Sequence, residues 1–140
     1  MNNIIIKKNW QDEQIVELQV TCVSDRITAT TEVYSTIRSL EDLANRLGQI
    51  INGELREAFW ECSEKGEGTT PYLSLRFETV DMRGHIRIEV FMELDDGGEP
   101  NKHTCCFYVK SELGLLESFH SRLQEFDGRI PGEEIAFVVN

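Results

Sequence analysis

The sequence predicts an α+β fold in which one antiparallel sheet of about six to seven strands carries two amphipathic helices on one face. Segments that alternate between apolar and polar residues recur along the chain, and two further segments place apolar residues at every third or fourth position. The first pattern is typical of strands with one buried face, and the second of helices packed on a core. No segment resembles an interdomain linker, so residues 1–140 are expected to form a single domain.

Strand character is clearest in the alternating segments of the second half of the chain. The segments with strand patterns are 4–7, 15–23, 27–34, 57–62, 72–80, 85–94, 103–110 and 134–139, and the first, fourth and last of these are weaker. Segments 72–80 and 85–94 are separated by a short turn and predict a hairpin. A tight register of this hairpin places Arg76 opposite Glu89, and Glu78 opposite Arg87.

Two segments have the apolar spacing of helices that bury one face. Ser39 is expected to cap the first helix, and Asn52-Gly53 is expected to end it. The second helix is expected to end at Asp127-Gly128. The residues expected to be buried are Leu40, Leu43, Leu47, Ile50 and Ile51 in the first helix, and Leu116, Phe119, Leu123 and Phe126 in the second.

An internal duplication is suggested by the match between the two halves of the chain. A shift of 76 residues superimposes the helix stripes and also places Val33 on Val109 and Arg46 on Arg122. Both halves would then consist of paired strands followed by a helix. The alternative is chance, because the stripes of any two amphipathic helices can be aligned by sliding one along the other.

The charge of the chain limits the classes of partner. It carries 25 acidic and 14 basic side chains, for a formal net charge of -11. This charge repels nucleic acid and anionic membrane surfaces, and it favours a basic protein as partner. The alternative is that the acidity serves only solubility.

The cysteines and the N-terminal segment favour a cytoplasmic protein. Cys22, Cys62, Cys105 and Cys106 have neither C-x-x-C nor zinc-ligand spacing, so they are expected to be free thiols in a reducing compartment. The apolar run at 4–6 is too short for a signal peptide, and no stretch approaches the ~20 apolar residues of a membrane span.

Catalytic and metal-binding patterns are weak throughout the sequence. The three histidines form no H-x-x-x-H motif, and Asp95-Asp96-Gly97-Gly98-Glu99 lacks the ligand spacing of an EF-hand. His103 and Cys105 lie on one strand face, but no carboxylate is placed to orient such a pair. We therefore expect a protein that is not an enzyme and that has no catalytic residues, metal or cofactor.

One acidic surface remains as a candidate partner-binding site. Glu89, Phe91 and Glu93 are expected to share the outer face of strand 85–94, and Asp95, Asp96 and Glu99 extend the negative charge beyond its end. An aromatic anchor inside a charged rim is typical of protein interfaces. An ordinary strand covered by another element would give the same pattern.

The segments 71–77, 83–90 and 115–123 together resemble small uncharacterised acidic bacterial proteins, some of which are similar to immunity proteins of polymorphic and contact-dependent toxin systems. This resemblance implies a cytosolic, non-catalytic protein that neutralises a basic toxin by binding it. The alternative function is a small-ligand-binding domain with a pocket between the sheet and the helices. No site residue follows from the resemblance.

Overall fold

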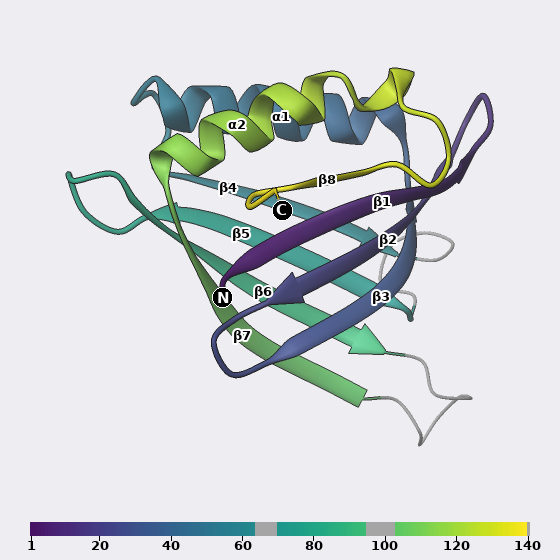
Figure 1. The fold of residues 1–140 in the computed structure, drawn as a ribbon, viewed down its shortest axis with the longest axis horizontal. Helices are drawn as coiled ribbons and strands as arrows, with labels where there is room; N and C mark the ends of the chain where they lie inside the picture. Colours follow the sequence, from purple (N-terminus) through teal and green to yellow (C-terminus); the bar gives the residue numbers. More distant parts are fainter. Residues whose placement is uncertain (64–69, 95–102, 140) are drawn as a thin grey trace.

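The computed structural model, which describes residues 1–63, 70–94 and 103–139, has the α+β class that the sequence predicts (Figure 1). The described residues form one antiparallel sheet of eight strands, one or two more than expected. The strands are β1 (Asn3–Gln11), β2 (Val16–Val23), β3 (Thr28–Ser35), β4 (Glu57–Ser63), β5 (Tyr72–Thr79), β6 (His85–Leu94), β7 (His103–Glu112) and β8 (Glu134–Ala136). The helices are α1 (Ile37–Ile51), α2 (Leu113–Gln124) and a short 3₁₀ helix, η1 (Phe126–Gly128).

The larger sheet arises because all the weak strand segments form. β1 extends to Gln11, well past the 4–7 segment, and it pairs with β2 on one side and with β8 on the other. β8 has only three residues, too few for an alternation to be read from sequence alone. Its pairing with Ile5–Lys7 is a tertiary contact that local sequence does not encode.

The sheet has the order β7-β6-β5-β4-β3-β2-β1-β8, and α1 and α2 lie side by side over one side of it (Figure 1). The sheet is strongly curved, since strands far apart in this order approach each other. The side chain of Asn2, just before β1, accepts a hydrogen bond from the backbone amide of Lys110 in β7 at 3.0 Å. The curvature encloses a single core between the sheet and the helices.

The elements follow one another in the same order twice, as β-β-β-α-β. The first set is β1 to β4 with α1, and the second is β5 to β8 with α2. A shift of 76 residues places Ile37, the first residue of α1, on Leu113, the first of α2. The last strand of each set pairs with the first strand of the other, because β4 pairs with β5 and β8 pairs with β1.

The helix stripes are buried as the sequence predicts. Ile51 is only partly buried, and Phe126 belongs to η1, since α2 ends at Gln124. The other stripe residues lie in the core, namely Leu40, Leu43, Leu47, Ile50, Leu116, Phe119 and Leu123.

The start of α1 differs from the prediction. The helix begins at Ile37, and its cap is Thr36, whose hydroxyl accepts a hydrogen bond from the Ser39 amide at 3.0 Å. The Ser39 hydroxyl instead accepts a hydrogen bond from the indole N–H of Trp60 at 3.0 Å. Ser39 therefore ties α1 to β4, and the end of the helix at Asn52, followed by Gly53 with a φ of 81°, agrees with the prediction.

The predicted β5–β6 hairpin is confirmed in its register. Arg76 lies opposite Glu89, and Glu78 lies opposite Arg87. The turn before β6 uses Gly84 at a φ of 88°, a conformation that side chains other than glycine rarely adopt. In the described part of the chain, no helix is long and apolar enough to cross a membrane.

Candidate functional site

The structure brings three of the predicted partner-binding residues together on the outer face of β6. Glu89, Phe91 and Glu93 alternate with the buried residues of this strand, as the pattern predicts. The other three, Asp95, Asp96 and Glu99, lie outside the described residues.

Phe91 is half-buried and not fully exposed. Its ring lies 6.0 Å from the ring of Tyr72 on β5, measured between centroids. The Tyr72 hydroxyl in turn donates a hydrogen bond of 2.5 Å to the carboxylate of Glu61 on β4. Phe91 is therefore packed within the outer face by its neighbours on adjacent strands.

Glu89 belongs to a mixed network and not to a purely acidic patch. It accepts a hydrogen bond from the hydroxyl of Tyr108 on β7 at 3.2 Å. The guanidinium of Arg87 stacks over the Tyr108 ring at 5.4 Å and forms a 2.6 Å ion pair with Glu78. Tyr108 remains 49% exposed, which makes it the most accessible aromatic side chain of this surface. The surface formed by Glu61, Tyr72, Glu89, Phe91, Glu93 and Tyr108 is called the Tyr–Glu face below.

Three of the four cysteines lie in settings that disfavour the reactive thiolate. Cys22 and Cys62 are buried, and burial raises the pKa of both thiols. Cys105 packs against the core, and burial likewise raises its pKa. Because the thiolate is the reactive form, these cysteines are poor nucleophiles. The described residues include no disulfide among the cysteines and no cluster of histidine, cysteine and carboxylate side chains that would hold a metal.

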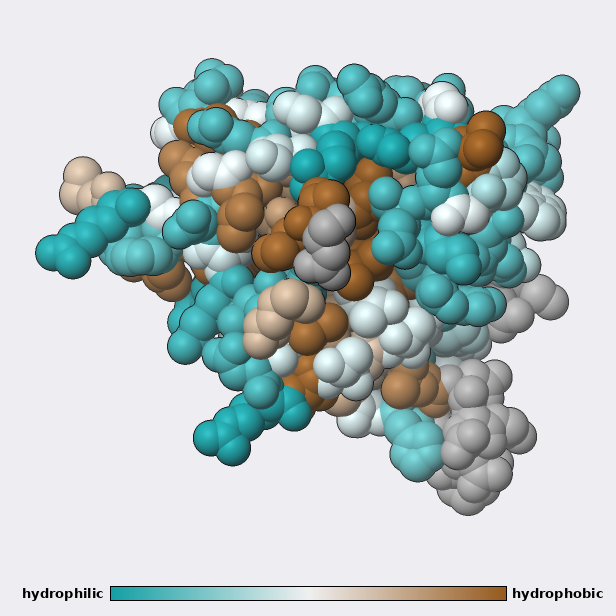
Figure 2. Space-filling view, in the orientation of Figure 1, coloured by the Kyte–Doolittle hydropathy of each residue, from teal (hydrophilic) through white to brown (hydrophobic). Residues whose placement is uncertain are grey.

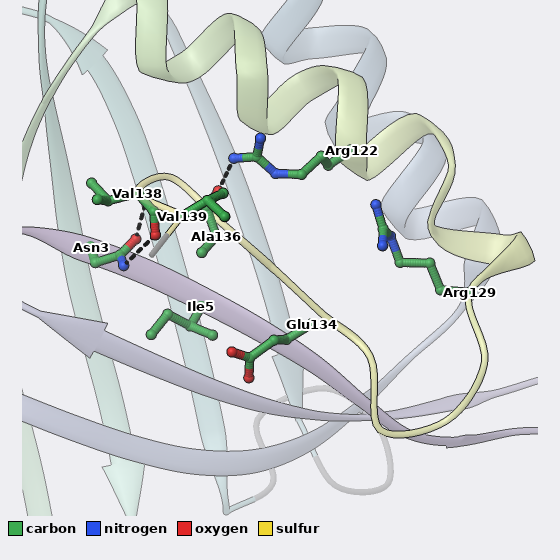
Figure 3. Close-up of a pocket in the computed structure, with 8 residues that line it drawn as sticks. All are labelled: Asn3, Ile5, Arg122, Arg129, Glu134, Ala136, Val138 and Val139. Carbon is green, nitrogen blue, oxygen red and sulfur yellow. Dashed lines mark hydrogen bonds between the residues drawn. The ribbon is translucent and has the colours of Figure 1, made fainter.

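A cavity of about 330 Å³ lies between α2, β1 and β8 (Figure 3). Neither its position nor its residues were identified from the sequence, beyond the general expectation of a pocket between sheet and helices. It is lined by Asn3, Ile5, Arg122, Arg129, Glu134, Ala136, Val138 and Val139.

Two guanidinium groups dominate the polar part of the cavity wall. Arg122 extends from α2 and donates a hydrogen bond to the carbonyl of Ala136, whereas Arg129 follows η1 and lies 3.4 Å from a carboxylate oxygen of Glu133. The Nε atoms of both arginines are buried and have no hydrogen-bond partner among the described residues. Burial, and then the positive charge of Arg129, lower the pKa of Arg122. The wall therefore brings two guanidinium groups close together, one of them with an ion-pair partner in Glu133.

The segment that carries Arg129 is fixed by a buried lysine. Lys8 is 1% exposed and points inward from β1. Its ammonium group donates to Gln11 Oε1 at 2.7 Å and to the backbone carbonyls of Asp127 and Arg129 at 3.3 and 2.7 Å. It also lies 5.0 Å from the ring of Phe126. Lys8 thus ties the turn between α2 and β8 to β1.

Arg46 on α1 is the counterpart of Arg122 in the first half of the chain. Arg46 donates a 2.5 Å hydrogen bond to the carbonyl of Phe59 in β4, just as Arg122 donates to the carbonyl of Ala136 in β8. The repeat in the sequence relates these two residues, but it does not reveal that Arg129 lies beside Arg122 on the cavity wall. Arg122 and Arg129 come together only in the folded protein, so the sequence alone does not predict their proximity.

Comparison of the chain with protein families, with curated proteins and with solved structures finds no match.

Proposed function

We propose that this chain is a non-catalytic protein-binding domain that uses the Tyr–Glu face. The observation that carries the proposal is the arrangement of Phe91 between two tyrosine–glutamate hydrogen bonds, on a side of the sheet away from the helices. Tyrosine is enriched at interfaces because its ring buries apolar area while its hydroxyl keeps a polar partner. The carboxylates Glu61, Glu89 and Glu93 add negative charge to the rim.

The partner that this surface favours is a basic protein. The net charge of -11 speeds encounter with a positively charged surface at low ionic strength. An immunity protein that acts in the cytoplasm and neutralises a basic toxin, such as a nuclease, is the specific form of this proposal. The mixed charges of the Tyr–Glu face, with Arg76 and Arg87 beside the carboxylates, would supply specificity more than affinity.

The test is co-expression and pull-down with the product of the neighbouring large open reading frame, together with an assay of protection from any toxicity of that product. A double charge reversal, Glu89→Lys with Glu93→Lys, is expected to abolish both capture and protection. The matched control is Glu17→Lys with Glu32→Lys on β2 and β3, which changes the net charge equally at a different place. Equal losses in the two double variants would show only a general charge effect and would contradict the Tyr–Glu face.

The second candidate function is binding of a small ligand, and the cavity beside α2 favours it. Its volume of about 330 Å³ is at the lower end of the roughly 300–1,000 Å³ typical of small-molecule sites. A thermal-shift screen against metabolites tests this candidate. The absence of any stabilising compound would count against it.

We also propose that the chain arose by duplication of a β-β-β-α-β unit. The matching order of elements and the reciprocal pairing of β4 with β5 and of β8 with β1 support this origin. A circular permutant tests it, with 70–139 placed first and joined to 1–63 by a linker as long as the β4–β5 connection. If the units are equivalent, the permutant folds cooperatively in urea. A permutant that stays unfolded would contradict equivalence.

A further inference from the structure

We propose that the cavity between α2, β1 and β8 binds a small organic carboxylate, held by Arg122 and Arg129. The site shares no residue with the Tyr–Glu face. The inference gives the second candidate function a ligand class, and it does not depend on a protein partner.

The first argument is electrostatic. Two guanidinium groups border the same cavity, and Arg122 donates only to a neutral backbone carbonyl among the contacts that the described residues provide. Arg129 has a carboxylate neighbour, Glu133, but at 3.4 Å this ion pair is long. Burial, and second the positive charge of Arg129, lower the pKa of Arg122, and a bound anion would offset the repulsion between the two guanidinium groups.

Among the described residues, Glu134 supplies the only carboxylate side chain that lines the cavity, and it does not neutralise these arginines. Glu134 is exposed on β8, and Figure 3 shows its carboxylate pointing away from both guanidinium groups. Within the described residues, Arg122 thus has no carboxylate partner, whereas Arg129 has Glu133. Glu134 at the border also disfavours a dianion, because a second negative charge in the cavity would be repelled.

The second argument comes from the rest of the lining. Ile5, Ala136, Val138 and Val139 supply apolar surface next to the arginines. Val139 is 68% exposed, and Figure 2 shows apolar atoms gathered in the middle of this side of the molecule, below the helices. A ligand with one charged end and a compact apolar body would satisfy both parts of the wall.

A carboxylate suits this geometry better than a phosphate. A guanidinium can pair with either anion through two hydrogen bonds, but a carboxylate monoanion is repelled less by Glu134 than a phosphate dianion is. Lys8 helps to position Arg129 before a ligand binds. Its ammonium group donates a 2.7 Å hydrogen bond to the backbone carbonyl of Arg129 and so holds the backbone from which this side chain projects.

The experiment is calorimetric titration of the full chain with benzoate, phenylacetate and isovalerate, with benzamide as the uncharged counterpart and inorganic phosphate as the alternative anion. We expect at least one carboxylate to bind and benzamide to bind at least tenfold more weakly. Carbon-13 methyl NMR should place the shifts on Ile5, Val138 and Val139. No binding by any of the carboxylates, or a preference for phosphate, would overturn the proposal.

Two variants test the role of the arginines. Arg122→Met and Arg129→Met are each expected to weaken carboxylate binding about tenfold or more, the effect of losing a charged hydrogen bond. Arg83→Met, on the exposed turn before β6, changes the net charge equally and should leave the affinity unchanged. Urea denaturation confirms that each variant is folded, and Arg122→Lys keeps the charge if the methionine variant unfolds. Unchanged affinity in folded Arg122→Met or Arg129→Met would contradict the assignment.

Discussion

Gly48 on α1 lies directly against the imidazole ring of His120 on α2. A β-carbon at position 48 would stand 3.1 Å from Nε2 of His120, closer than a normal van der Waals contact. The absence of a side chain at Gly48 thus allows the two helices to pack closely beside each other over the sheet.

The first prediction follows from this contact. Gly48→Ala gains helix propensity, about 1 kcal/mol, but in the natural chain the imidazole must move, so the gain is smaller. In a His120→Ala background the full gain should return, giving a coupling energy of about 0.5 kcal/mol or more in a double-mutant cycle measured by urea denaturation. Gly114→Ala is the control, because a β-carbon there meets nothing within 4 Å. Equal gains from Gly48→Ala in both backgrounds would show that the ring imposes no constraint.

The second prediction separates Thr36 from Ser39 at the start of α1. Thr36→Ala removes the cap and is expected to lower the free energy of unfolding by about 1 kcal/mol, whereas Thr36→Ser keeps it. Ser39→Ala instead leaves the indole N–H of Trp60 without its partner, at a cost of about 1–3 kcal/mol. Tryptophan fluorescence in a Trp10→Phe background should shift for Ser39→Ala and not for Thr36→Ala. The reverse pattern would assign the cap to Ser39.

These two residues illustrate what the sequence can and cannot predict. The alternation in β5 and β6 and the stripe of α1 are local patterns, and they located the hairpin register and the buried helix face. Thr36 and Ser39 are both good capping residues, and only the contact with Trp60 decides between them. Local propensity therefore identified the helix but not its first residue.

The candidate sites likewise could be predicted only as far as local sequence patterns reach. Alternation placed Glu89, Phe91 and Glu93 on one face, but it gave no sign that Tyr108 on β7 binds Glu89. The cavity was not located because Arg122 and Arg129 meet only through the turn after α2. The first predicted strand ended at Lys7 because the next residue, Lys8, stands at an inward position. A charged side chain is rarely buried without specific partners.

The buried side chain of Lys8 gives the third prediction. Lys8→Met is expected to lower the free energy of unfolding by about 2 kcal/mol, because the backbone carbonyls of Asp127 and Arg129 lose their donor inside the protein. Lys7→Met, on the other face of the same strand, should change it by less than about 0.5 kcal/mol. Chemical denaturation of both variants provides the measurement. Equal stability of the two variants would mean that Lys8 is not a structural tie.

The fourth prediction concerns the ionisation of Tyr72 in the Tyr–Glu face. Burial, and then the hydrogen bond to Glu61, raise the pKa of Tyr72 to about 12. An ultraviolet titration of the phenols should therefore show a late step that Tyr72→Phe removes. Glu61→Gln should lower the pKa of Tyr72 only partly, because burial is the larger cause. Glu32→Gln on β3 is the control and should leave the late step in place.

The raised pKa of Tyr72 also predicts how the stability of the protein depends on pH. The folded state favours the neutral phenol, so the contribution of Tyr72 is fully present below its ordinary pKa of about 10. It is lost as the pH rises from about 10 to about 12, because the unfolded chain releases this proton first. Over that window the free energy of unfolding should fall more steeply for the natural chain than for Tyr72→Phe. Parallel pH profiles would show that Tyr72 ionises as an ordinary surface phenol and that its packing against Phe91 and Glu61 is loose.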